Sequence, residues 1–161
     1  MSIILGIDPG TSRIGFAFLE KRGDSINLLE YGCLELAKKR SQVERLKAIN
    51  DEIGGLIGKH RPETAAVEKL FFSKNTKTAL SVAEARGVLL NICAQNGLNL
   101  MEFAPTEVKL ALTGYGRAEK SQVQKMVMSI LKLPKMPQPD DAADAIAVAL
   151  TACYTNKNLK K

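Results

Sequence analysis

An uninterrupted apolar run near the start of the chain, from Ile3 to Ile7, stops abruptly at Asp8-Pro9-Gly10. A short apolar run bounded by turn residues is typical of a buried β-strand. The run therefore predicts a first strand inside a sheet, with Asp8 at its carboxyl end.

Two more apolar segments follow, and further along the chain the spacing of apolar residues is typical of helices and strands in turn. The segments 14–19 and 26–36 flank Arg22-Gly23-Asp24-Ser25, which suits a hairpin turn, so we expect a three-stranded antiparallel meander. We then expect a helix from Val43 to near Lys59, a strand over 64–68, a helix over 76–95 and a strand over 98–103. The apolar face of the second helix is expected to consist of Leu80, Ala83, Gly87, Leu90 and Ala94.

The remainder of the chain is predicted to be helical. A short helix after Pro105 reaches about residue 112, and a second spans about 118–131. A proline-rich loop then precedes a last helix, which starts at Asp140 or Asp141 and ends near Cys153. This order indicates an α/β fold in which helices flank a mixed five-stranded sheet, three antiparallel strands being followed by parallel ones.

The composition favours one domain. The chain has 161 residues, of which 45% are hydrophobic and 25% charged, as in an ordinary globular protein. We expect this domain to span residues 1–154, with a basic, disordered tail over 155–161. No apolar run approaches the roughly 18 residues of a membrane span, and the N-terminus lacks signal-peptide features, so a cytoplasmic protein is expected.

Cysteine spacing and net charge narrow the function further. Cys33, Cys93 and Cys153 are far apart and form no C-x-x-C pair, so we expect three buried free thiols rather than disulfides or a zinc site. The formal net charge of +6 suggests an anionic partner, although part of the excess lies in the C-terminal tail. Charge alone favours nucleic acid over a membrane surface only modestly.

Four acidic residues occupy positions from which they can converge. Asp8 ends the first predicted strand and Glu68 the fourth, while Asp141 and Asp144 share one face of the last helix. Such a cluster is unfavourable unless a cation lies within it, and an all-oxygen set favours Mg²⁺ or Mn²⁺ over zinc. Two such ions can activate a water for attack on a phosphodiester, so the pattern predicts a phosphodiester hydrolase.

Each acid also has a simpler explanation. Asp8-Pro9-Gly10 suits a turn, Glu68 suits a strand end in solvent, and Asp140-Asp141 suits the start of a helix. Asp144 is harder to explain in this way, because alanine and isoleucine surround it in the sequence.

Five segments together resemble the RuvC family of Holliday junction resolvases. Their order and spacing match from residue 3 to about 151, and the segments are Ile4-Leu5-Gly6-Ile7-Asp8-Pro9-Gly10, Val67-Glu68-Lys69-Leu70-Phe71-Phe72, Glu84-Ala85-Arg86-Gly87, Ala118-Glu119-Lys120-Ser121-Gln122-Val123 and Asp141-Ala142-Ala143-Asp144-Ala145. The resemblance implies a ribonuclease H-like fold, a homodimer, and symmetric Mg²⁺-dependent cleavage of four-way DNA junctions in recombination and repair. It assigns two ions per site to Asp8, Glu68, Asp141 and Asp144, with Mn²⁺ as a substitute, and suggests a branch-migration motor as partner. Asp140 departs from the family, in which better-known members have a small residue.

Basic and aromatic residues near these segments are candidates for DNA contact. The basic candidates are Lys69, Lys74, Lys77, Arg86, Lys109, Arg117 and Lys120. Lys120 opens a helix, where a cation opposes the helix dipole, which hints at a phosphate ligand; the resemblance also places Lys109 and Lys120 near the active site. Phe71 is expected to stack on an unpaired base, although Phe71 and Phe72 can instead pack in the core. Lys74 and Lys77 can equally form a solvated helix face.

Three other functions are compatible with parts of the pattern. The Gly6–Ser12 segment is similar to the phosphate-binding turn of sugar kinases and actin, but those proteins need a second domain for which this chain is too short. A ribonuclease H-like nuclease acting on ribosomal RNA would share Asp8 and a late aspartate. A basic DNA-binding protein without activity remains an alternative, although it leaves the four acids without a role.

Overall fold

The computed structural model describes residues 1–37, 39–70 and 76–155, and of residues 76 and 77 the backbone alone. Within these residues the chain forms, in order, β1 (Ser2–Asp8), β2 (Arg13–Arg22), β3 (Ser25–Glu35), α1 (Gln42–His60), β4 (Thr64–Glu68), α2 (Thr76–Gln95), β5 (Asn99–Phe103), α3 (Pro105–Thr113), α4 (Lys120–Leu131) and α5 (Asp140–Thr155). Every expected element is present, and α5 continues two residues beyond the expected end.

The five strands form one mixed sheet in the order β3-β2-β1-β4-β5. β1, β2 and β3 are antiparallel neighbours, whereas β4 runs parallel to β1 and β5 runs parallel to β4. The predicted meander and the mixed sheet are therefore confirmed. Gly23 in the β2–β3 turn has a φ of 60°, a left-handed conformation that glycine adopts without strain.

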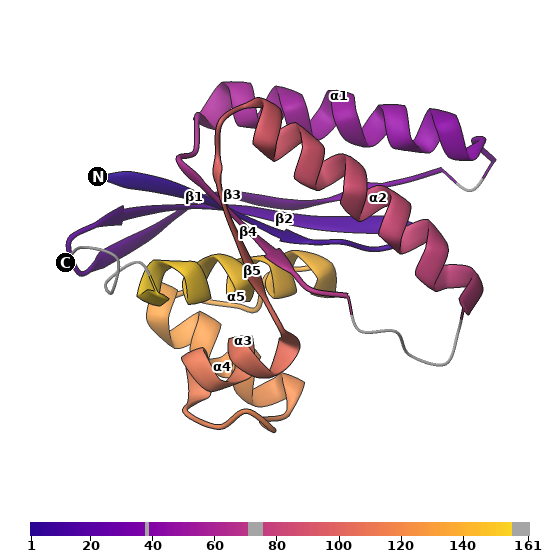
Figure 1. Cartoon of the computed structure of the whole chain (residues 1–161). Coiled ribbons are helices and arrows are strands. Elements are labelled where there is room, and N and C mark those ends of the chain that lie inside the picture. The colour runs from indigo at the N-terminus through magenta and orange to yellow at the C-terminus, as the bar shows by residue number, and fades with distance from the viewer. Residues whose placement is uncertain (38, 71–75, 156–161) are drawn as a thin grey trace.

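Helices cover both faces of the sheet (Figure 1). α1 and α2 lie over one face, and α5 lies against the other, with α3 and α4 packed beyond it. The strand β1 contributes to both layers, because Ile4 belongs to the core on the α5 side while Leu5 and Ile7 belong to the core under α1 and α2. This position between two helical layers explains why its sequence is apolar throughout instead of alternating.

The helix α5 packs unusually closely on β1 and β2. Between Ala142 and Cys153 every residue except Asp144 is buried. A Cβ added at Gly6 would overlap the carbonyl oxygen of Ala145, and one added at Gly15 would overlap that of Asp141. These two glycines therefore let the helix backbone rest directly on the sheet.

The buried face of α2 differs from the expected one. Ala85, Leu89, Ile92 and Cys93 face the core, whereas Leu80 is 69% exposed and Gly87 and Ala94 are also exposed. The prediction was wrong in part, since Leu90 does pack against the core, because the helix carries apolar and small residues on more than one side and periodicity alone does not select the stripe that meets the sheet. The outward side of α2 consequently carries Leu80, Gly87 and Ala94 together with the polar residues Glu84 and Asn91.

Two further expectations concern cysteines and membranes. The three cysteines are free thiols, and Cys93 and Cys153 are buried as expected, while Cys33 is half-buried. Among the described residues, none of the helices has both the length and the apolar character needed to cross a bilayer.

Candidate active site

Asp8 and Glu68 meet at one edge of the sheet. They end β1 and β4, which are parallel neighbours, so their carboxyl ends point to the same side. Both residues are half-buried, and their carboxyl groups lie close enough for each to affect the pKa of the other.

Asp141 and Asp144 approach this pair from α5. They lie three residues apart at the start of the helix, so both are on one face, and their side chains are 31% and 37% exposed. The close contact between Gly15 of β2 and the Asp141 backbone sets the position of this first turn beside the carboxyl end of β1. Residues that are up to 136 positions apart in the chain are thereby brought to one edge of the sheet.

The pKa values of the acids reflect this crowding. Burial, followed by the negative charges of Glu68 and Asp144, raises the pKa of Asp8 from 3.8 to about 8. Burial also raises the pKa values of Glu68 and Asp144 above their usual range. Asp8 therefore retains its proton at neutral pH when no cation compensates the charge of the cluster.

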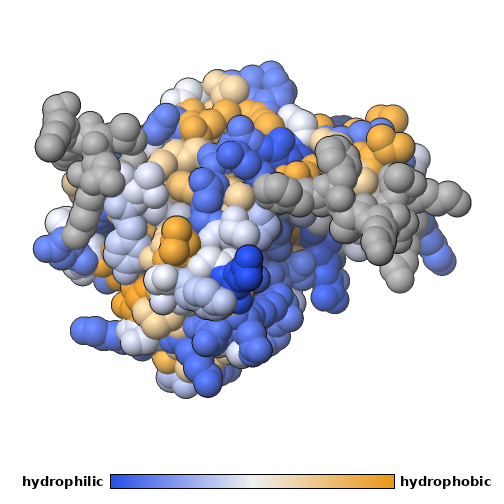
Figure 2. Space-filling view, turned by 60° about the horizontal axis from the view of Figure 1, so that its bottom comes forward, coloured by the Kyte–Doolittle hydropathy of each residue, from blue (hydrophilic) through white to orange (hydrophobic). Residues whose placement is uncertain are grey.

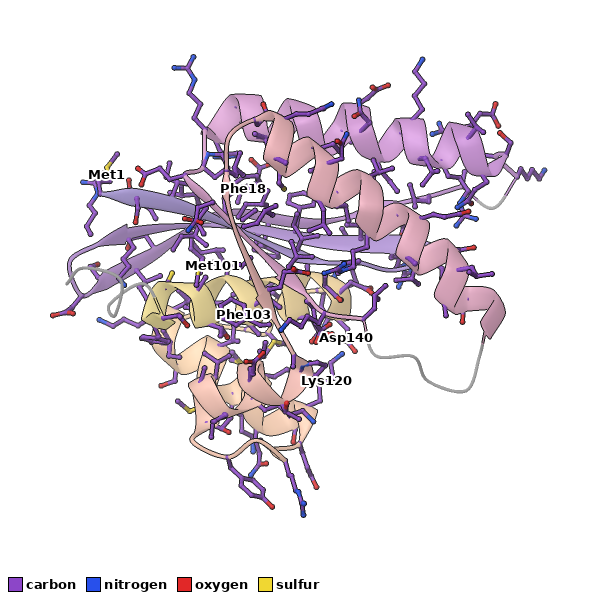
Figure 3. All side chains as sticks on the ribbon, in the orientation of Figure 1. Met1, Phe18, Met101, Phe103, Lys120 and Asp140 are labelled. Atoms are coloured by element: carbon purple, nitrogen blue, oxygen red, sulfur yellow. The ribbon has the colours of Figure 1, made fainter. Side chains whose placement is uncertain are left out.

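Two basic side chains already contact the acids. Lys120 Nζ, at the start of α4, lies 2.9 Å from Asp144 Oδ2 and 3.4 Å from Asp140 Oδ2. Figure 3 shows Lys120 and Asp140 close to one another at the start of α5. On the other side, Arg13 Nη1 lies 4.0 Å from Asp141 Oδ2 and Arg13 Nη2 lies 3.4 Å from Glu35 Oε1.

Burial and the neighbouring acids shift the pKa of Lys120 in opposite directions. Burial lowers the pKa of its ammonium group, but the hydrogen bond and charge of Asp144, together with the charge of Asp140, outweigh burial and raise the pKa above its usual value. Lys120 is therefore a firmly charged group at the rim of the acids.

The donor set suits a hard divalent cation, although it is not a preformed cage. In the part of the chain that the structure describes, no three acidic, histidine or cysteine side chains converge closely enough to hold a metal ion. The pKa of about 8 keeps a proton on Asp8 at neutral pH, and Lys120 engages Asp144. The oxygen-only set and its raised pKa values fit Mg²⁺ or Mn²⁺, whose charge would replace that proton and that ammonium group.

The other predicted basic residues lie in different surroundings. Lys109 of α3 is half-buried, and its charge acts to lower the pKa of Glu68, while Lys69 and Arg117 are exposed in loops. Arg86 is turned inward, with its guanidinium engaged by Glu102 and by the backbone of Glu68. Phe71 and Lys74 lie outside the described residues, as does the side chain of Lys77.

A pocket of about 240 Å³ adjoins the acids. Glu68, Asp144, Lys109 and Lys120 form its charged part, and apolar side chains of α3, α4 and α5 form the remainder. The surrounding face, which carries α3 and α4, is largely hydrophilic with separate apolar patches (Figure 2). The site thus presents both charges and an apolar surface to a ligand.

Sequence reasoning did not identify two of these contacts. Arg13 received no role, although a basic residue soon after the Asp8 turn is a usable signal. Asp140 was noted as a residue suited to the start of the last helix and as a departure from the family pattern, and its contact with Lys120 depends on the approach of α4 to α5.

The comparisons with known proteins agree with this geometry. The family described as "Crossover junction endodeoxyribonuclease RuvC" matches residues 4–152. The protein with the same description from Halothermothrix orenii is 46% identical over 154 residues, which cover 96% of this chain and 92% of the relative. Its counterpart from Pelotomaculum thermopropionicum is 49% identical over 148 residues, covering 92% and 90%.

A solved structure supports the fold as well. "T. thermophilus RuvC in complex with Holliday junction substrate" is 32% identical and superposes with a TM-score of 0.92, over 98% of this chain and 96% of that one. The ribonuclease H-like fold that the resemblance implied is thereby confirmed. Sequence, fold and the matched length agree, and the chain belongs to the RuvC family of crossover junction endodeoxyribonucleases.

Proposed function

We propose that this chain resolves four-way DNA junctions during homologous recombination and DNA repair, by symmetric hydrolysis of phosphodiesters with divalent metal ions. The observation that carries the proposal is the meeting of Asp8, Glu68, Asp141 and Asp144 at one edge of the sheet, in a chain of this family. The junction complex of the Thermus relative supports the choice of substrate.

The four acids are proposed to hold two Mg²⁺ ions, for which Mn²⁺ can substitute. When bound, such a pair lowers the pKa of the attacking water and neutralises the charge of the leaving oxygen. Asp8 would have to lose its proton to solvent, since its pKa of about 8 reflects the metal-free state and Glu68 must also be ionised to bind metal. Lys120 would exchange Asp144 for a phosphate oxygen of the DNA while Asp140 keeps its ammonium group near the site.

The DNA is proposed to lie across the face that carries α3 and α4. Lys109 and Lys120 line the pocket beside the acids, and Lys69 and Arg117 are exposed. Lys74 and Lys77 are proposed to extend this phosphate contact, and Phe71 to stack on a base that is unpaired at the crossover.

A homodimer is the proposed working form, because two cuts related by a two-fold axis need two sites related in the same way. The outward stripe of α2 is a suitable interface with a second copy. Leu80 is 69% exposed there, and a Cβ added at Gly87 would meet no atom within 4 Å, so the small residue has no evident role inside the protomer. A branch-migration motor and a cytoplasmic location are proposed from the family alone.

Incubation with three substrates tests the proposal. A synthetic four-way junction, a linear duplex and an RNA–DNA hybrid are each treated with purified protein, with and without Mg²⁺. We expect paired nicks at symmetric positions in the junction alone, and only with the metal. Cleavage of the hybrid in preference to the junction would instead indicate an RNA-directed nuclease.

A further inference from the structure

We infer that Arg86 is a positioning residue that holds the Glu68-bearing end of β4 in place for metal binding, rather than a DNA contact. The inference rests on the proposed function, because it concerns how that function's metal site is kept in shape. It gives a role to a residue that sequence reasoning had placed among the phosphate ligands.

The guanidinium group of Arg86 joins α2 to two neighbouring strands. Its Nε donates to the backbone carbonyl oxygen of Glu68, with 3.4 Å between the two atoms, and Nη2 pairs with the Glu102 carboxylate of β5. The Arg86 side chain is 18% exposed, whereas the Glu102 side chain is 41% exposed. The group therefore lies beneath the surface, with its charge compensated from one side.

Glu68 needs such support because it is at the end of the sheet. β1 pairs with β4 only as far as Ile7 and Val67, so beyond Val67 the strand is held by β5 alone. There Glu68 is paired with Phe103, and the amide of Lys69 donates to the Phe103 carbonyl at 2.8 Å. The contact from Arg86 adds a second anchor from the helix above.

Electrostatic repulsion among the acids favours movement of the Glu68 end of β4, and the contact from Arg86 opposes that movement. Asp144 is a negatively charged neighbour of Glu68, and like charges at close range favour separation of the groups. A strand end held on one side can respond by moving its carboxylate out of reach of the metal. Groups that orient metal ligands without contacting the metal commonly change affinity or activity by about 10–100-fold when removed.

The geometry also separates Arg86 from a phosphate ligand. Burial lowers the pKa of its guanidinium, although an arginine remains charged at neutral pH, and its inward contacts leave little of it for DNA. A residue that neutralises a phosphate changes the slope of log affinity against log salt by about one when it is removed. Arg86 should not change that slope.

The test uses R86M, which keeps the length of the side chain but removes its donors, with R86K and E102Q beside it. Mn²⁺ binding is measured directly by calorimetry, and single-turnover cleavage of a junction is measured over a range of metal concentrations. For R86M we expect Mn²⁺ affinity and cleavage to fall by about 10–100-fold, with cleavage recovering at high metal. R86K should lie between R86M and the unmodified protein, because one ammonium group cannot serve both partners.

Junction binding without metal supplies the contrasting measurement, with R117M as the matched control from an exposed loop. R86M should keep the affinity and salt slope of the unmodified protein, whereas R117M should flatten the slope by about one. The inference is overturned if R86M binds Mn²⁺ within twofold of the unmodified protein, or if it behaves like R117M in the salt titration.

Two further outcomes are decided by the same set of proteins. If R86M does not fold, the test relies on E102Q. This variant removes the charge partner of Arg86 but leaves the contact of Nε with Glu68 possible, so it must show a smaller loss of Mn²⁺ affinity. An unchanged Mn²⁺ affinity in E102Q overturns the inference. If the unmodified protein neither binds Mn²⁺ nor cuts the junction, it is the proposed function that fails, together with this inference. A normal unmodified protein and a normal R86M refute the positioning role alone.

Discussion

The helices α5 and α2 are both rich in apolar residues, yet they use their surfaces in opposite ways. α5 is buried on nearly all sides from Ala142 to Cys153, and it rests on β1 and β2 through the glycines at positions 6 and 15. α2 buries one stripe and leaves Leu80 and Gly87 outside.

This difference in burial matches the residues that each helix contributes to the site. Asp141 and Asp144 are part of α5, so a small movement of this helix moves two of the four candidate metal ligands. α2 reaches the site through the long side chain of Arg86 and leaves its outer stripe available to a second copy. Close packing thus coincides with the site, and the exposed side chain of Leu80 coincides with the proposed interface.

The largest effect is expected where α5 meets β1. Asp8→Asn keeps the shape of the side chain but weakens a carboxylate ligand, so cleavage of a junction should fall by about a thousandfold or more. Junction affinity without metal should stay equal or rise slightly, because one negative charge is lost. Cleavage assays in Mg²⁺ and gel shifts in its absence check both points, and near-normal cleavage would remove the metal-site interpretation.

A smaller but still large effect is expected from Gly15→Ala. The added methyl group overlaps the Asp141 carbonyl, which costs about 1–3 kcal/mol, or about 3–10 °C in Tm for a domain of this size. Cleavage should fall by about a hundredfold because both acids of α5 shift. Gly55→Ala in α1, where a Cβ meets no atom, is the control and should keep Tm or raise it slightly. Equal Tm values for the two variants would contradict the close packing of α5.

The outer stripe of α2 should respond differently. Leu80→Lys should leave the Tm of the protomer within about 2 °C, since substitutions at exposed sites usually change stability by no more than about 0.5 kcal/mol. The dimer should dissociate more readily, by at least about tenfold, and paired nicks should become independent of one another. Sedimentation over a range of concentrations measures the change, and an unaltered dimer would place the interface elsewhere.

The last effect concerns pH and is expected on stability, not on cleavage. Burial raises the pKa of Asp8 from 3.8 to about 8, so between these values the folded protein binds more protons than the unfolded chain. Stability without metal should therefore decrease, and Tm should fall, as pH rises from about 4 to about 8. Thermal melts in a chelator at several pH values test this; Asp8→Asn should flatten the dependence, and Mg²⁺ should offset it. A Tm that rises through this range would contradict the shift.

The sequence by itself determined the elements and the identity of the candidate ligands. Apolar runs and helical spacing were sufficient to place β1, the meander and α5, because local burial and backbone preference act within a few residues. The acids were recognisable because Asp8 and Glu68 end strands and Asp144 interrupts an apolar helix. The resemblance then added the family, which the comparisons confirmed.

Only the tertiary structure determined which residues from distant parts of the chain contact one another. The buried stripe of α2 depends on which side meets the sheet, and several of its sides are apolar enough to do so. Arg86 could face DNA or the protein, because a long basic side chain can adopt either direction, and the place of Glu102 on β5 settled the choice. Lys120 contacts Asp140 and Asp144 because α4 packs against α5. A proline-rich loop separates these two helices in the sequence.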